Sequence, residues 1–124
     1  MTGKRILVIE DEFLVAIDIQ SQLENAGVLQ VEQSATEKDA LKRIGDGGWD
    51  AAVVDANLNG RSIERVAAAL IHNHIPFVVV TGYNRDSLPP ELVHTPVLSK
   101  PLRGPHLVQE LSRLFPDDVS PAQL

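Results

Sequence analysis

The 124-residue sequence contains no cysteine, and aromatic residues make up only 4% of it. Without cysteine the protein can form neither a disulfide nor a thiolate metal site. No apolar run approaches the roughly 20 residues that a membrane-spanning helix needs. The early run "ILVI" (6–9) is also too short for the core of a signal peptide. We therefore expect a cytoplasmic protein that does not insert into a membrane.

Basic residues are in the minority. Eleven lysines and arginines stand against 17 aspartates and glutamates, which gives a formal net charge of −6 at pH 7. Nonspecific nucleic-acid binding needs cations that replace phosphate counterions, so this balance disfavours it. With 44% hydrophobic residues the chain can bury a core, and its length fits one domain. We expect that domain over residues 1–116, followed by a loose polar tail over 117–124.

Apolar runs alternate with helical patterns along the chain. Strands are expected at 6–9, 29–34, 51–55 and 76–81, and a short fifth strand is expected within 95–101. Helices are expected to begin at Glu12, Thr36, Ile63 and Gly104, and the third should bury Ile63, Val66, Ala67, Leu70 and Ile71. Strands that alternate with helices in this way predict an α/β fold, with a parallel sheet and helices on both faces.

Local signals mark several helix boundaries. Thr36 and Asp39 have the spacing of a capping pair, so a short helix should begin there. Gly27 is well placed to end the first helix. The connection between the fourth and fifth strands, 82–94, holds a Pro–Pro pair and no sustained apolar period. Any helix in that connection should therefore be short or irregular.

Polar residues stand where the expected strands end. Glu10 and Asp11 stand at the end of the first strand, Asp55 ends the third, Thr81 ends the fourth, and Lys100 follows the fifth. Ligands of an open parallel sheet bind outside the carboxyl ends of its strands, so these side chains should face one cleft. Three carboxylates in one cleft repel one another, and a hard divalent cation relieves that repulsion. Oxygen ligands without a nearby His or Cys favour Mg²⁺ over zinc.

A metal, a carboxylate, a lysine and a hydroxyl together are typical of a phosphoryl-transfer site. Asp55 can be the nucleophile and become an aspartyl-phosphate. Lys100 would then neutralise charge on the transferred group, and Thr81 would donate a hydrogen bond to one of its oxygens. Gly82 leaves room for its backbone N–H to approach the same group. Glu12 is interpreted separately, as a favourable charge in the first turn of a helix.

The motifs at these strand ends resemble those of response-regulator receiver domains. The motifs are "ED" (10–11), "VVDANLNG" (53–60), "TG" (81–82) and "KP" (100–101), and the likeness runs from about Arg5 to Phe115. The resemblance implies a flavodoxin-like, doubly wound sheet of five strands in the order 2-1-3-4-5. It also implies a response regulator of two-component signalling, phosphorylated by a histidine kinase.

For the site, the resemblance implies specific roles. Asp55 would be the phosphoacceptor, and Asp11 and Asp55 would bind Mg²⁺ directly. Glu10 would bind the ion through water, and the backbone carbonyl of Asn57 would complete the protein ligands. The Lys100–Pro101 peptide would be cis. Such a protein is not an enzyme, apart from its own phosphorylation and dephosphorylation.

The sequence departs from the family pattern near the site. The loop after the acceptor lacks a proline, and Val97 occupies the place of an aromatic residue three positions before the lysine. Tyr83 is a candidate replacement for that aromatic residue. The run "PFVVVTGY" (76–83) resembles a subgroup with a Pro-Phe-x-Phe-Ala-Thr-Gly-Tyr motif, often partnered by histidine kinases of the HWE type. Val79 and Val80 replace the Phe and Ala of that motif.

The expected partners are a sensor histidine kinase and an unidentified downstream protein, without nucleic acid or membrane. No output domain fits in 124 residues, so the output would be protein–protein contact or a phosphate sink. Two alternatives stay open. A degenerate receiver would serve only as an interaction module. A phosphatase of the haloacid dehalogenase type would need a second aspartate where the chain has Asn57.

Overall fold

The computed structural model describes residues 3–60, 62–82, 95–100, 102 and 105–115. Its elements are β1 (Arg5–Ile9), α1 (Phe13–Asn25), β2 (Gln30–Ser34), α2 (Glu37–Asp46), β3 (Ala51–Asp55), α3 (Glu64–His72), β4 (Phe77–Thr81), β5 (Val97–Ser99) and α4 (His106–Arg113). Three expectations concern residues outside this description: the irregular helix with Tyr83, the cis Lys100–Pro101 peptide, and the tail. Within the described residues, no helix has both the length and the apolar character to cross a membrane.

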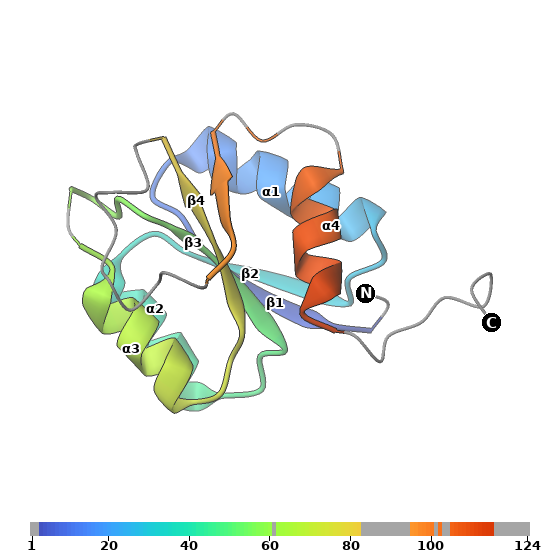
Figure 1. Ribbon diagram of the computed structural model, residues 1–124. Helices are drawn as coiled ribbons and strands as arrows, with labels where there is room; N and C mark the ends of the chain where they lie inside the picture. The colour runs from blue at the N-terminus through green and yellow to red at the C-terminus, as the bar shows by residue number, and fades with distance from the viewer. Residues whose placement is uncertain (1–2, 61, 83–94, 101, 103–104, 116–124) are drawn as a thin grey trace.

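The five strands form one parallel sheet in the order β2-β1-β3-β4-β5, which confirms the predicted flavodoxin-like fold. Figure 1 shows α1 and α4 on one face of this sheet and α2 and α3 on the other. Helical crossovers between parallel strands have one hand, so a chain that reverses its direction along the sheet covers both faces. Because every strand pair is parallel, all five strands end at the same edge of the sheet.

The central strands are covered on both faces, and so every residue of β3 and β4 is buried. Successive side chains of a strand point to opposite faces of the sheet. Val78 and Val80 accordingly pack in the layer of α1 and α4, whereas Val79 packs against α2 and α3. This two-sided burial explains why the strands are continuous apolar runs in the sequence.

The start of α2 follows its predicted signal in part. The Thr36 hydroxyl accepts a hydrogen bond from the Asp39 backbone N–H at 3.1 Å, as an N-cap residue does. The Asp39 carboxylate instead accepts hydrogen bonds from Ser34 Oγ at 2.6 Å and from Arg43 Nε at 2.9 Å. Gly27, just beyond α1, has a φ of 88°, the left-handed conformation expected of a glycine that ends a helix.

The predicted buried stripe of α3 is wrong at one position. Val66, Ala67 and Leu70 are buried as expected, but Ile71 is 54% exposed. Ile71 lies about 100° from Leu70 around the helix axis, at one border of the apolar stripe and in the last turn of α3. Leu70 takes the buried position in the last turn, and Ile71 turns toward solvent.

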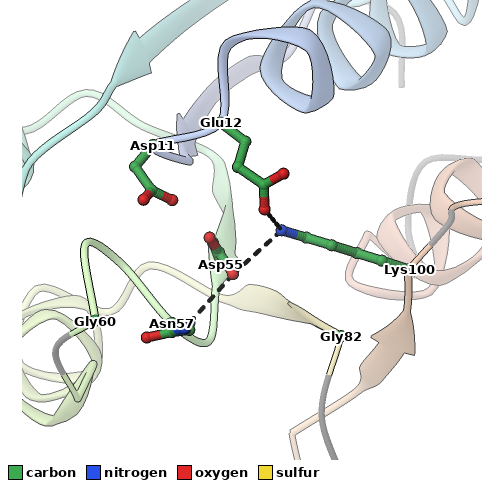
Figure 2. A pocket seen from close by; sticks show the side chains of 7 residues that line it. All are labelled: Asp11, Glu12, Asp55, Asn57, Gly60, Gly82 and Lys100. Atoms are coloured by element: carbon green, nitrogen blue, oxygen red, sulfur yellow. Dashed lines mark hydrogen bonds and ion pairs between the residues drawn. The ribbon is translucent and has the colours of Figure 1, made fainter.

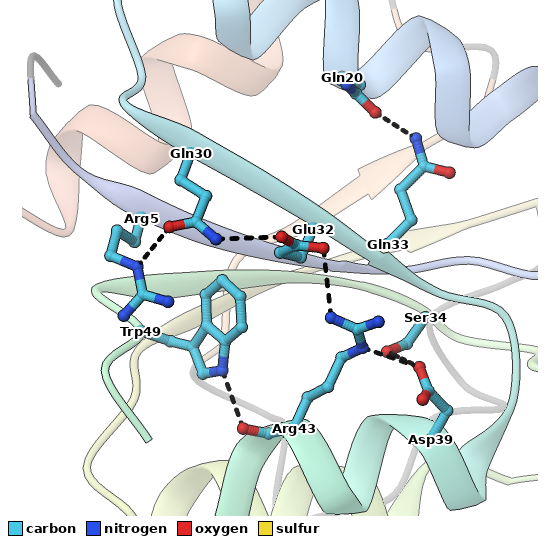
Figure 3. A network of polar contacts seen from close by, with 9 residues as sticks. All are labelled: Arg5, Gln20, Gln30, Glu32, Gln33, Ser34, Asp39, Arg43 and Trp49. Atoms are coloured by element: carbon cyan, nitrogen blue, oxygen red, sulfur yellow. Dashed lines mark hydrogen bonds and ion pairs between the residues drawn. The ribbon is translucent and has the colours of Figure 1, made fainter. Parts of the chain in front are cut away.

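A polar network covers the edge strand β2 (Figure 3). Arg43 of α2 forms ion pairs with Glu32 of the strand at 3.2 Å and with Asp39 at 2.9 Å. Charged side chains on an edge make it less available to a further strand. At the end of β2, the backbone O of Ser34 accepts a hydrogen bond from the Glu10 N–H at 3.0 Å. The edge strand therefore also fixes the chain just beyond β1.

Candidate functional site

The predicted site residues meet at the carboxyl edge of the sheet. Glu10 and Asp11 follow β1, Asp55 is the last residue of β3, and Lys100 follows β5. A pocket opens there, and Figure 2 shows the Asp55 carboxylate between Asp11 and Lys100. The residues that line the pocket are Asp11, Glu12, Asp55, Asn57, Gly60, Gly82 and Lys100.

Two predicted residues, Glu10 and Thr81, are buried next to the pocket and do not line it. Thr81 is the last residue of β4, as predicted. Its backbone O accepts a hydrogen bond from the Lys100 N–H at 2.9 Å. This bond joins the ends of β4 and β5, so the chain leaves β5 beside Thr81 and carries the lysine to the pocket.

Three carboxylates form a group that can hold a metal ion. Glu10, Asp11 and Asp55 each offer one oxygen, and these oxygens lie within 4.8 Å of one another. Glu10 is 3% and Asp55 4% exposed, so water does little to screen their repulsion. A set of hard oxygen ligands with this charge fits a divalent cation such as the predicted Mg²⁺.

Lys100 is the cation that contacts these carboxylates within the described part of the chain. Its Nζ lies 2.9 Å from Glu10 Oε1, 2.9 Å from Glu12 Oε1 and 3.5 Å from Asp55 Oδ1. The contact with Glu12 is a hydrogen bond, whereas the contact with Glu10 is an ion pair without hydrogen-bond alignment. Burial alone lowers the pKa of Lys100, but Glu10 and Glu12 outweigh burial and raise it. The ammonium therefore stays charged beside these acidic side chains.

The surroundings shift the pKa values of Asp55 and Asp11 in opposite directions. Burial and the neighbouring Glu10 raise the pKa of Asp55 to about 8, although the Asn57 N–H donates a hydrogen bond to its Oδ1 at 3.1 Å. Burial also acts to raise the pKa of Asp11, but hydrogen bonds from Asp55 and from the Asn59 backbone outweigh it and lower this pKa. Without a metal, these shifts favour the protonated form of Asp55 and the ionised form of Asp11.

The short turn after β3 is attached to the chain just beyond β1 and just beyond β2. Asn59 donates its backbone N–H to Asp11 Oδ2 at 3.1 Å and its side-chain Nδ2–H to Ala35 O at 2.9 Å. Asn59 has a φ of 54° and Gly60 a φ of 76°, left-handed conformations that suit these two residue types. The turn places Asn57 at the pocket wall, where its carbonyl is predicted to bind the metal.

Two residues of this site are not predicted from the sequence. The sequence indicates only a helix-terminus charge for Glu12, but its side chain contacts Lys100, 88 positions later. A contact between residues so far apart leaves no local pattern. Asn59 does leave one, because an Asn–Gly pair is a turn signal and could have marked the residue.

Similarity to known proteins is found among solved structures; no protein-family model and no curated protein matches the chain. SdrG from Sphingomonas melonis Fr1 is 36% identical, with 91% of this chain and 97% of that chain covered and a TM-score of 0.77. A response regulator receiver domain (CheY-like) from Methylobacillus flagellatus is 24% identical, with 91% and 99% covered and a TM-score of 0.74.

A third structure is similar in fold. It is the receiver domain of the sensor histidine kinase PA1611 from Pseudomonas aeruginosa PAO1, with a magnesium ion coordinated in its active site cleft. That domain is 20% identical, with 91% of this chain and 98% of that chain covered and a TM-score of 0.78. The likeness to SdrG thus extends to sequence, whereas the other two likenesses concern the fold.

Proposed function

Because the chain belongs to the response-regulator receiver family, we propose that it is a phosphorylation switch of two-component signalling. In this proposal Asp55 accepts a phosphoryl group from a histidine kinase, with Mg²⁺ bound beside it, and loses the group by hydrolysis. One observation carries the proposal: the buried Asp55 carboxylate lies between a second carboxylate, Asp11, and the ammonium of Lys100. An acyl-phosphate acceptor needs such a carboxylate with positive charge beside it.

The donor set supports Mg²⁺ as the metal. Asp11 and Asp55 would hold the ion directly, Glu10 through water and Asn57 through its backbone carbonyl. A bound ion supplies positive charge that stabilises the oxygens of a transferring phosphoryl group. The PA1611 receiver domain holds magnesium in its active site cleft, which supports the same choice for this chain.

Each residue of the site then has its own role in the transfer of the phosphoryl group. Asp55 loses its proton, and its oxygen forms a bond to phosphorus. The bond from phosphorus to the donor's imidazole nitrogen breaks, and the electron pair stays with the imidazole. Lys100, whose Nζ is 3.5 Å from Asp55 Oδ1, holds negative charge on the phosphoryl oxygens. Thr81 and the backbone N–H of Gly82 donate hydrogen bonds to the other oxygens.

The partners in this proposal are a sensor histidine kinase, of the HWE type, and a downstream protein in the cytoplasm. The kinase type rests on the run "PFVVVTGY" (76–83). Phosphorylation adds nearly two negative charges and three acceptor oxygens at Asp55, which changes the contacts of the residues around it. A structure of SdrG in a BeF3-activated conformation supports a response of this kind. The output is contact with the downstream protein or removal of phosphoryl groups from the kinase.

Intact-mass measurement tests the proposal. Wild type, Asp55→Asn and Asp46→Asn are incubated with acetyl phosphate, with Mg²⁺ or with EDTA. Asp46 is an exposed aspartate at the end of α2 and serves as the matched control. We expect one added phosphoryl group, dependent on Mg²⁺, in the wild type and in Asp46→Asn but not in Asp55→Asn.

Three other results would contradict the proposal. An unmodified wild type, beside an active receiver that is modified, would indicate a degenerate interaction module. Modification of Asp55→Asn would place the acceptor elsewhere. Turnover of a general phosphate ester that is lost in Asp55→Asn would indicate a phosphatase, although Asn57 stands where a dehalogenase-type enzyme has its proton-transferring aspartate.

A further inference from the structure

Glu12 stands at the rim of the acceptor pocket, directly after the acidic pair Glu10 and Asp11. It is the residue before α1, yet its side chain makes no capping hydrogen bond to that helix. Its Oε1 lies 2.9 Å from Lys100 Nζ instead (Figure 2). The Glu12 side chain is 62% exposed, so packing does not impose this direction. The contact with the lysine orients it.

Glu12 is the partner that Lys100 can release most easily. An ammonium group has three N–H donors, and the two shortest contacts of this one are to Glu10 and Glu12. Glu10 is buried, and its Oε1 would lose its cation without gaining solvent if the lysine moved away, since the Glu12 N–H bonds to Oε2 instead, at 3.4 Å. Glu12 faces water, which replaces the ammonium at little cost.

A phosphoryl group on Asp55 competes with Glu12 for the same ammonium. It brings nearly two negative charges and three acceptor oxygens within reach of Lys100. We infer that Glu12 is a positioning residue, which holds Lys100 while Asp55 is unmodified and is released when Asp55 is phosphorylated. The inference rests on the proposed function, and it adds a residue to those that the receiver resemblance implies.

The consequence is that Glu12 slows the phosphorylation of Asp55, called loading below. With acetyl phosphate, an Asp55 oxygen bonds to phosphorus, the bond from phosphorus to the acetyl oxygen breaks, and acetate leaves with the electron pair. Lys100 stabilises the transferring group better once it has left Glu12, because a further N–H is then available to a phosphoryl oxygen. An exposed ion pair contributes a factor of roughly two to five to an equilibrium. Glu12→Gln, which removes the charge but keeps the length, should therefore load about two- to five-fold faster.

The test is the rate of phosphorylation by acetyl phosphate, measured by intact mass at a fixed Mg²⁺ concentration. Physiological salt is used because it largely screens the repulsion between distant exposed charges. Glu24→Gln is the matched control, because Glu24 is an exposed glutamate at the other end of α1. Each substitution is made with Lys100 present and in the Lys100→Ala background. We expect Glu12→Gln to accelerate loading only where Lys100 is present, and Glu24→Gln to leave the rate unchanged in both.

The NMR signal of the Lys100 side-chain Cε–Hε group reports directly on the contact with Glu12, and a purely structural role of Glu12 would not move it. This measurement decides the question if Lys100→Ala is phosphorylated too slowly to follow. Glu12→Gln should shift this signal in the unmodified protein. Mg²⁺ with beryllofluoride should bring the wild-type and Glu12→Gln signals together, because the lysine has left position 12 in both.

Two kinds of failure are distinguishable. If wild type and Glu12→Gln load at the same rate, or if the acceleration persists without Lys100, the inference is overturned while the proposed function stands. An unchanged Lys100 signal in Glu12→Gln overturns it as well. A wild type that acetyl phosphate does not load overturns the proposed function, and the inference falls with it.

Discussion

The substitution Asp55→Asn should make the metal-free protein more stable. Asp55 is buried beside Glu10 and Asp11, and its pKa is raised from 3.8 to about 8 in the folded state. The same carboxyl is ionised in the unfolded chain at neutral pH. A raised carboxyl pKa means that the folded state binds the extra proton, so its stability falls as the pH rises between the two pKa values. Asparagine has nearly the same shape and no proton to bind.

The size of the effect follows from the pKa shift. Each pH unit between the two pKa values removes about 1.4 kcal/mol from the free energy of unfolding, which amounts to about 4 kcal/mol at pH 7. Asparagine keeps an acceptor for the Asn57 N–H, but its amide replaces the O–H through which the protonated carboxyl bonds to its acidic neighbours. We therefore expect Asp55→Asn to raise the free energy of unfolding by about 2–3 kcal/mol at pH 7. The gain should increase toward pH 8 and vanish toward pH 4.

Urea unfolding with EDTA present, at pH 5, 6, 7 and 8, measures this difference. The fluorescence of Trp49 reports on folding, because this single tryptophan donates its Nε1–H to Arg43 O at 2.9 Å. Asp46→Asn controls for the loss of one charge, and Mg²⁺ should stabilise the wild type and reduce the difference. The reasoning is refuted if Asp55→Asn is less stable at pH 7, or if its advantage is the same at pH 5 and pH 8.

Three further changes separate the roles of the other residues. Asp11→Ala should weaken Mg²⁺ binding by about tenfold or more, measured by calorimetry, because it removes a predicted ligand; unchanged affinity would show that the acidic pair is misplaced. Lys100→Ala should slow the loading of Asp55 by about 10²-fold, and a rate equal to that of the wild type would remove the lysine from the transfer step. Thr36→Ala should cost about 1 kcal/mol in urea unfolding through loss of the helix cap, without a change in the loading rate.

The strands and the edge that carries the site follow from local patterns. Strands covered on both faces are continuous apolar runs, and the first polar residue after each run marks where the strand ends. Asp55 and Thr81 are for this reason the last residues of β3 and β4, as the sequence predicts. Because all the strands are parallel, their ends meet at one edge, so Asp11, Asp55 and Lys100 could be grouped before any contact was known.

The remaining contacts depend on geometry that no local pattern contains. Glu12 has the residue type and position of a helix-terminus charge, and only the approach of β5 to β1 across the pocket gives it Lys100 as a partner. Asp39 fits a capping pair, but a buried hydroxyl, Ser34, and a nearby guanidinium compete for its carboxylate. Ile71 continues an apolar period, yet it lies at the border of the buried stripe near the end of α3 and is exposed.

The lysine that partners the acidic cluster is the last part of that cluster to be synthesised. While the ribosome is still making β4, the chain can already pair β1 with β3, and this pairing brings Asp11 and Asp55 together with no cation. In such a nascent intermediate the acidic groups lack their cation, so closing the cluster stabilises it less than it stabilises the complete domain. The cluster therefore gains its cation only after β5 has been made, and the contacts of Lys100 add to the stability of a domain that closes as one cooperative unit.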